Sequence, residues 1–140
     1  MTDDPWTAHS LTFLEMAFRT DRQMPMPNPS GWGRRKGVCG DAVEFYIRLD
    51  GDVVREITYQ VNGCMNTNAC ANALIAMAEA KSLGDAWRLT PEMVADRLQS
   101  LPPDHFHCAE LAVGAFYRAL SDCRRQGRAG WKTVYRRRKR

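Results

Sequence analysis

Two apolar stretches of period two, joined by a glycine turn, constrain the fold of this chain most. In the first stretch Val43, Phe45 and Ile47 alternate with polar or amphipathic residues, and residues 57–61 repeat the pattern after the sequence DGD. Gly51 at the centre of that sequence suits the left-handed backbone of a tight turn. The pattern therefore predicts an antiparallel hairpin of two strands that turns at Gly51.

Segments of helical period surround this hairpin. Residues 7–19 place Leu11, Leu14 and Phe18 at helical spacing, which predicts an amphipathic helix with these three on its apolar side. The sequence QMPMPNPSGWG that follows is rich in proline and glycine and predicts a loop. A second helix is expected from Ala69 onward, with its start capped by one of three polar residues, Asn66, Thr67 or Asn68.

Two further helices are expected in the second half of the chain. Thr90 and Pro91 suit the N-cap and first position of a short helix that closes before Pro102. A last helix is expected from about residue 107 to residue 124. Its apolar stripe consists of Cys108, Ala112, Phe116, Ala119 and Cys123. Hairpin and helices together predict an α+β domain in which helices cover a small antiparallel β-sheet.

Charge is divided unevenly along the 140 residues, a length that suits one domain. Residues 124–140 hold nine Lys and Arg and no acid, so the remaining body carries a net charge of −5 within a chain of +4. We therefore expect a domain over residues 1–124 and a basic tail over residues 125–140. Asp3 and Asp4, and the absence of a long apolar run, favour a cytoplasmic protein without an export signal or membrane span.

Five cysteines, an odd number, favour metal binding or thiol chemistry over disulfides in a reducing compartment. Cys39, Cys64 and Cys108 each fall where an expected element begins or ends, and their separations are 25 and 44 residues. A thiolate at a helix start is favoured by the helix dipole, and we expect Cys108 to gain most from it. This spacing matches neither ferredoxins nor zinc fingers, so it identifies no metal by itself.

The sequence motifs around these cysteines carry more information than the spacing of the cysteines. The sequences GVCGDAVEFYIRL, VNGCMNTNACANAL and LPPDHFHCAELA resemble, in this order, three motifs of the iron-sulfur cluster assembly scaffolds, the IscU and NifU N-terminal family. The resemblance covers roughly residues 8–124 and implies a SufE/NifU-like fold. It implies that Cys39, Cys64 and Cys108 are the thiolate ligands of a [2Fe-2S] cluster and that Asp41 and His107 are its other ligands or exchange partners.

The resemblance also implies partners for a protein that is not an enzyme in the turnover sense. These are a cysteine desulfurase that delivers sulfur, an iron donor, and apo iron-sulfur proteins that accept the cluster, and a homodimer is left open. Where IscU-type members carry Pro-Val-Lys, this chain has Pro103, Asp104 and His105, which puts recognition by an Hsp70-type chaperone in doubt. Zinc is a further ion that the apo-scaffold could hold.

Two other functions fit parts of the sequence. A SufE-like persulfide acceptor needs only one exposed cysteine, and three separated thiols argue against it. A zinc-stabilised nucleic-acid-binding module would use the basic tail, but a charged run without a folded reading element gives only nonspecific affinity. We favour a tail that is solvated or docks a partner, with Trp131 and Tyr135 as anchors.

Several residues keep a simpler interpretation. Cys123 continues the apolar stripe and is expected in the core, whereas Cys70 is expected to be an auxiliary thiol or a small buried residue. His9 is expected to be solvated, and His105 to be a turn residue outside the site. Asp41 has the alternative role of stabilising the turn after Cys39.

Overall fold

The computed structural model describes residues 10–38 and 40–138, with side chains through residue 127. Cys39, His9, Trp131 and Tyr135 therefore lie outside what is described in side-chain detail, and the predictions made for them stay predictions. The elements are α1 Leu11–Phe18, β1 Gly31–Lys36, β2 Ala42–Asp50, β3 Val53–Asn62, α2 Met65–Ala78, α3 Leu83–Ala86, α4 Pro91–Leu98, the short 3-10 turn η1 Pro103–His105, and α5 Phe106–Arg138.

The predicted hairpin is confirmed as β2 and β3, which pair antiparallel and turn at Gly51 with a φ of +63°. Val43, Phe45 and Ile47 are fully buried on one face, as the alternation predicts. The opposite face carries polar contacts, among them the ion pair between Arg34 and Glu44 at 3.2 Å. The hairpin thus has one face for the core and one face for solvent.

A third strand, β1, lies in a part of the chain that was expected to be a loop. Residues 31–36 pair antiparallel with β2, so the sheet order is β1-β2-β3. The sequence GWGRRK has neither period-two hydrophobicity nor β-branched residues, and this is why its pattern did not predict a strand. The predicted small antiparallel sheet is therefore confirmed, and it contains one edge strand in addition to the predicted hairpin.

The glycines of β1 explain why such a sequence forms a strand here. A Cβ on Gly33 would lie 2.2 Å from the backbone nitrogen of Ala119, and a Cβ on Gly31 would lie 2.4 Å from the carbonyl oxygen of the same residue. Only glycine lets the strand approach the backbone of α5 this closely. Tight packing between β1 and α5 therefore replaces the side-chain pattern that usually marks a strand.

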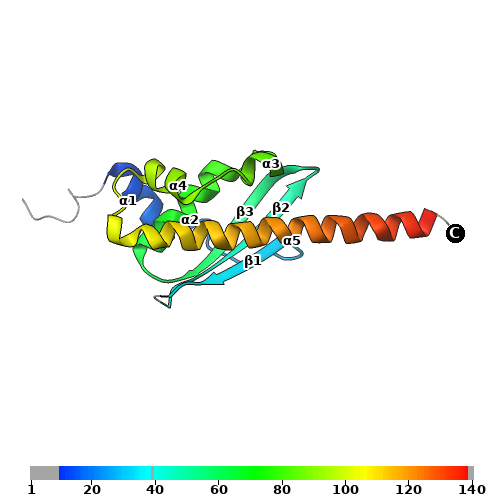
Figure 1. The fold of residues 1–140 in the computed structure, drawn as a ribbon, viewed down its shortest axis with the longest axis horizontal. Coiled ribbons are helices and arrows are strands. Elements are labelled where there is room, and N and C mark those ends of the chain that lie inside the picture. The colour runs from blue at the N-terminus through cyan, green and yellow to red at the C-terminus, as the bar shows by residue number, and fades with distance from the viewer. Residues whose placement is uncertain (1–9, 39, 139–140) are drawn as a thin grey trace, which may run out of the picture.

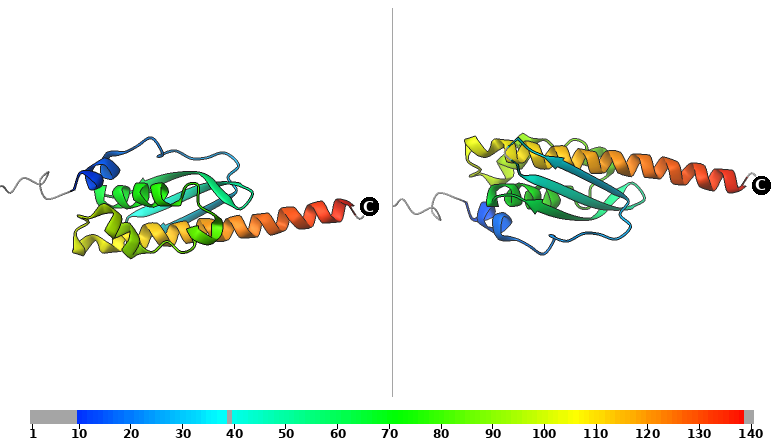
Figure 2. Two further views of the ribbon diagram at one scale, coloured as in Figure 1. Left: turned by 90° about the horizontal axis from the view of Figure 1, so that it is seen from above. Right: turned by 90° about the horizontal axis from the view of Figure 1, so that it is seen from below.

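The helices gather on one face of the sheet, and α5 runs across it as the longest element (Figures 1 and 2). The predicted stripe on α5 is confirmed, since its members have exposed fractions of 3% or less. The helix begins at Phe106 and continues to Arg138, beyond the predicted end at residue 124. Its last turns project past the sheet, so the basic segment continues the helix backbone (Figure 1).

Helix α1 buries a different face from the predicted one. Leu11 and Phe18 are 72% and 55% exposed, whereas Phe13 and Ala17 are buried. The i, i+4 pair of Phe13 and Ala17 forms the face that lies in the core. Asn72 of α2 fixes this orientation, because its amide donates to the carbonyl oxygen of Met16 at 2.8 Å. The buried amide of a neighbouring helix thus decides which side of α1 faces inward.

Helix α2 begins earlier than predicted. Its first residue is Met65, and Cys64 is its N-cap. The three candidate caps at positions 66–68 therefore lie inside the first turn. The predicted cap of α4 is confirmed, since the hydroxyl of Thr90 accepts from the backbone N–H of Met93 at 3.2 Å.

Among the described residues, no helix is long and apolar enough to span a membrane.

Candidate metal centre

Three side chains from separate parts of the chain converge at one end of the molecule. Cys64 caps α2 directly after β3, His105 ends η1, and Cys108 lies in the first turn of α5. One ligand atom from each of these residues lies within 4.8 Å of those of the other two. Such a separation allows a single metal ion to bind to all three, because metal-sulfur and metal-nitrogen bonds measure about 2.0–2.3 Å.

Thr67 connects this group to Asp41. Its buried hydroxyl donates to Oδ2 of Asp41 at 2.8 Å and lies 3.4 Å from Sγ of Cys108 and 3.7 Å from Sγ of Cys64. The backbone N–H of Cys64 also donates to Asp41 at 3.4 Å. Gly63 leaves room for the carboxylate, since a Cβ there would lie 2.6 Å from Oδ2. Asp41 is therefore held beside both cysteines by the start of α2.

Sequence reasoning considered Thr67 only as a helix cap. Its place in the first turn of α2, three residues after Cys64, brings its hydroxyl under the thiol. Once the helix is known to begin at Met65, that spacing indicates the contact. Because the predicted start of α2 was wrong, sequence reasoning missed the contacts of Thr67 with Cys64 and Cys108.

Cys64 is exposed and carries the more acidic thiol. Its partial burial favours the neutral form, but hydrogen bonds from the backbone and side chains of Thr67 and Asn66 outweigh that effect and hold the pKa of Cys64 below its ordinary value. The amides of a helix start stabilise an anion in the same sense. Cys64 is thus the described cysteine that is best prepared to act as a thiolate.

Cys108 differs from the expectation that the helix dipole would favour its thiolate most. The side chain is fully buried, and burial raises the pKa of Cys108 to about 11, opposed by the hydrogen bond from Thr67. Desolvation exceeds the effect of the helix start at this position. A metal ion that displaces the proton would supply the missing positive charge.

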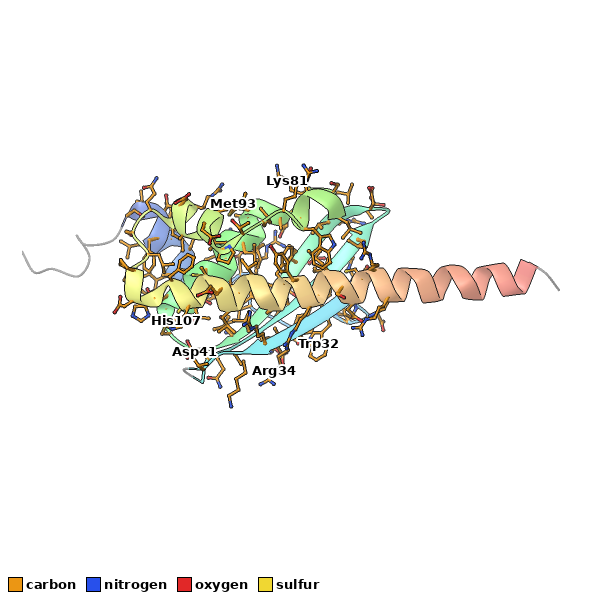
Figure 3. All side chains as sticks on the ribbon, viewed as in Figure 1. Trp32, Arg34, Asp41, Lys81, Met93 and His107 are labelled. Carbon is orange, nitrogen blue, oxygen red and sulfur yellow. The ribbon has the colours of Figure 1, made fainter. Side chains whose placement is uncertain are left out.

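The two histidines of the motif are neighbours at the start of α5, with ring centroids 5.7 Å apart. His107, predicted from the resemblance, lines a hollow of about 180 Å³ together with Arg35, Val38 and Glu110. In Figure 3 His107 and Asp41 lie at the same end of the molecule. His105, set aside as a turn residue, is the histidine grouped with Cys64 and Cys108.

The loop between β1 and β2 places Asp41 directly before the first residue of the central strand β2. The backbone N–H of Gly37 donates to the carbonyl oxygen of Asp41 at 2.8 Å, and Gly40 has a φ of +92°. Cys39 belongs to this loop but lies outside the described residues. Its role as a ligand therefore stays a prediction.

The two remaining cysteines are core residues. Cys70 is fully buried in the second turn of α2, and burial, aided by the nearby thiols of Cys108 and Cys64, raises its pKa. Cys123 is 3% exposed, and burial raises its pKa to about 12, which confirms its predicted place in the core. Neither belongs to the group of ligand atoms described above.

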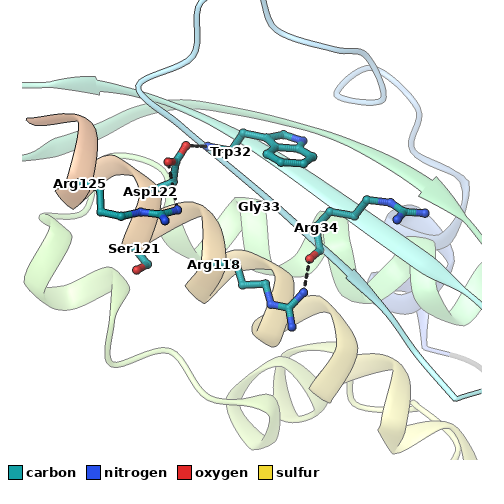
Figure 4. A pocket seen from close by; sticks show the side chains of 7 residues that line it. All are labelled: Trp32, Gly33, Arg34, Arg118, Ser121, Asp122 and Arg125. Carbon is teal, nitrogen blue, oxygen red and sulfur yellow. Dashed lines mark hydrogen bonds and ion pairs between the residues drawn. The ribbon is translucent and has the colours of Figure 1, made fainter. Parts of the chain in front are cut away.

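A further hollow lies away from Cys64 and Cys108, and no cysteine lines it. It lies between β1 and α5 and has a volume of about 500 Å³. Figure 4 shows the residues that line it. Asp122 accepts a hydrogen bond from the backbone N–H of Trp32, and Arg118 donates one to the carbonyl oxygen of Arg34. None of the predicted site residues lines it. Arg118 thus joins α5 to β1, whereas Arg34 pairs with Glu44 within the sheet.

The donor set is suited to iron or zinc. Thiolate and imidazole bind both ions, and a carboxylate beside them offers an exchangeable oxygen ligand. Cys64, His105 and Cys108 supply two sulfurs and one nitrogen, with Asp41 adjacent. The residues present therefore fit a thiophilic metal ion, and mixed donors bind a cluster less firmly than four cysteines do.

Curated relatives resemble this chain over the region of these motifs. An iron-sulfur cluster assembly scaffold protein IscU of Archaeoglobus fulgidus is 34% identical over 85 residues, which cover 61% of this chain and 56% of the relative. A protein of the same description from Aquifex aeolicus is 31% identical over 93 residues, 64% of this chain and 59% of the relative. The chain thus spans less than two thirds of the length of these relatives.

Solved structures show the same fold. A protein of Fervidobacterium islandicum, described as a scaffold for iron-sulfur cluster assembly in the SUF system, superposes with a TM-score of 0.70 at 17% identity, covering 83% of this chain and 98% of its own. A NifU-like N-terminal protein of Brucella abortus superposes with a TM-score of 0.65 at 16% identity, and the superposition covers 84% of this chain and 92% of that protein. These likenesses confirm the predicted α+β, NifU-like fold.

The model of one protein family matches most of the domain. The NifU-like N-terminal domain matches residues 32–129, which include β1, the hairpin, α2 and the convergent cysteines. The sequence motifs, the fold and this match agree, and the chain belongs to the family of NifU-like N-terminal domains.

Proposed function

We propose that this chain is a scaffold on which a [2Fe-2S] cluster is assembled and from which it is transferred to apo-protein acceptors. The observation that carries the proposal is the convergence of Cys64 and Cys108 with Asp41 around the hydroxyl of Thr67. Relatives at 31–34% identity are named as iron-sulfur cluster assembly scaffolds. Cys39 is a further proposed thiolate ligand, and His107, which lies at the same end of the molecule as Asp41 (Figure 3), is proposed as an exchange partner during transfer.

The thiols of Cys64 and Cys108 have different parts in this proposal. Cys64 is exposed and has the lowered pKa, so it receives the first iron or sulfur. Cys108 is buried and releases its proton only when a cation binds beside it, since metal binding requires the thiolate. Asp41 is bonded to Thr67, and its oxygen is the donor most readily exchanged for an acceptor's ligand.

The proposed partners follow from this chemistry. A cysteine desulfurase supplies sulfur, an iron donor supplies the metal, and apo iron-sulfur proteins receive the cluster, while the scaffold itself turns over no substrate. Asp104 and His105 stand where IscU-type members carry Val and Lys, so we propose no Hsp70-type chaperone. A cytoplasmic location and a homodimer remain predictions.

One observation favours a second candidate function. A persulfide acceptor of SufE-like type needs a single exposed, acidic thiol, and Cys64 has both properties. The scaffold proposal is better supported, because His105 and Cys108 lie within ligand distance of that thiol. A simple sulfur acceptor needs neither of them.

Anaerobic reconstitution with iron-57, cysteine and a desulfurase tests the proposal. Cys39→Ser, Cys64→Ser and Cys108→Ser should each abolish the visible spectrum and Mössbauer signal of a [2Fe-2S] cluster, with circular dichroism unchanged. Cys123→Ser, whose side chain lies in the core away from the site, is the matched control and should load the cluster normally. If all three site variants load iron like the parent, the scaffold proposal is wrong, and persulfide on Cys64 alone would support the sulfur acceptor.

A further inference from the structure

His105 has an imidazole nitrogen without a hydrogen-bond partner in the part of the chain that the structure describes. Its Nδ1 is buried and accepts or donates no hydrogen bond among the described residues. Buried polar atoms in proteins are nearly always paired, and an exception calls for an explanation. One nitrogen of the same ring lies within 4.8 Å of the sulfurs of Cys64 and Cys108, and an imidazole beside two thiols has the properties of a metal ligand.

The backbone around His105 fixes the position of its ring. The prolines at 102 and 103 set the course of η1, and the backbone N–H of His105 donates to the carbonyl oxygen of Pro102 at 2.9 Å. Phe106, the next residue, packs against the core. The ring is therefore presented to Cys64 and Cys108 by a rigid turn, and its ligand atom lies within 4.8 Å of both sulfurs.

His107 cannot take the same position as His105. Two residues apart on a helical backbone, side chains point to different sides. His107 faces the hollow lined by Arg35, Val38 and Glu110, while His105 faces the thiols. Their ring centroids lie 5.7 Å apart, and among the described residues it is His105 whose ligand atom is grouped with those of Cys64 and Cys108.

We propose that His105, and not the adjacent motif residue His107, is the histidine ligand of a metal ion bound between Cys64 and Cys108. The inference rests on the proposed function, because it names the donor that completes the site for the first ion. Two sulfurs and one nitrogen leave one position of a tetrahedral ion for a further donor. His107 then remains on the Val38 side, where it is free to contact the loop that carries Cys39.

Zinc and cobalt(II) binding to the full chain tests this assignment without cluster assembly. The reduced protein is titrated with zinc in competition with a chromophoric chelator, and its zinc-loaded form is studied by X-ray absorption, in which imidazole gives outer-shell scattering. His105→Ala should lower zinc affinity by at least about 10-fold, since loss of a residue that merely supports a ligand already costs that much. It should also remove the imidazole scattering and weaken the cobalt(II) spectrum.

His107→Ala is the comparison variant: because the proposal places His107 outside the coordination of this first ion, the variant should keep the zinc affinity and the imidazole scattering. His105→Gln, which keeps a polar side chain at the turn, guards against a folding defect and should behave like His105→Ala. The proposal is overturned if His107→Ala removes the imidazole scattering while His105→Ala retains it, or if both variants bind zinc as the parent does.

The outcome also separates this proposal from the scaffold function. If His105→Ala binds zinc normally while Cys64→Ser still abolishes cluster loading, only the assignment of His105 fails. If the parent binds cobalt(II) through His105 but assembles no cluster with iron and a desulfurase, only the scaffold function fails.

Discussion

Replacing Thr67 by valine tests whether its hydroxyl organises the site. Valine has the same shape and fills the same buried space, so the change removes the hydrogen bond to Asp41 at 2.8 Å and the contacts to both sulfurs. A hydrogen bond to a charged group contributes about 1.5–3 kcal/mol, and because Asp41 is half-buried and regains water, we expect a loss of about 1–2 kcal/mol. This corresponds to a decrease in Tm of roughly 3–8 °C.

The reactivity of Cys64 gives a second, sharper readout of the same variant. The backbone N–H of Thr67, which valine keeps, and its hydroxyl, which valine lacks, both lower the pKa of Cys64. Thr67→Val should therefore raise that pKa in part and slow alkylation of Cys64 by iodoacetamide near neutral pH. Peptide mass spectrometry separates its rate from those of the other cysteines. Thr67→Ser is the control: it loses a buried methyl group, which costs about 0.8 kcal/mol, yet keeps the alkylation rate. Equal rates in the parent and the valine variant would refute the reasoning.

Three further predictions concern packing, pH and charge. Gly33→Ala should lower the free energy of unfolding by about 1–3 kcal/mol, because its Cβ meets the α5 backbone. Gly127→Ala, with open space around the new Cβ, should raise that free energy by up to about 1 kcal/mol. Urea titrations measure both, and equal effects of the two variants would contradict the packing argument. Burial raises the pKa of Cys108 from 9.0 to about 11, so its stabilising contribution is full below pH 9.0 and is lost as the pH rises toward 11. Urea unfolding should show this decline, with a shallower one in Cys108→Ala, and an unchanged slope in that variant would count against it. Residues 125–140 hold eight Lys and Arg and no acid. Removing them should leave cluster loading intact and weaken binding to the desulfurase at low salt, as measured by calorimetry. Unchanged binding would show that the segment has no role in docking.

Local pattern predicted those parts of the fold in which side chains alternate or recur visibly. The hairpin, the cap of α4 and the buried stripe of α5 follow from Phe45, Thr90 and Phe116 and their neighbours. Strand β1 could not be predicted in this way, because it is held by the close approach of Gly33 to a helix more than 80 residues later in the chain. Such a tertiary contact leaves no periodic signal in the strand itself.

In the candidate site, too, some residues could be predicted from the sequence and others could not. The motif cysteines and Asp41 could be placed from the sequence, since a resemblance fixes their order along the chain. Thr67 and His105 could not, because their roles depend on the residue at which α2 begins and on the turn that η1 makes before α5. Both depend on geometry of a single helical turn, where prediction from sequence is least accurate.

Cluster transfer is the most direct test of the central claim that this chain builds a cluster in order to give it away. The chain is loaded anaerobically with iron, cysteine and a desulfurase, separated from the reagents, and mixed with an apo-ferredoxin in the presence of a chelator that captures free iron. The account predicts that the circular dichroism of the [2Fe-2S] ferredoxin appears as that of the scaffold disappears, with little iron reaching the chelator. A cluster that stays on the chain, or iron that passes to the chelator while the ferredoxin remains empty, would contradict it.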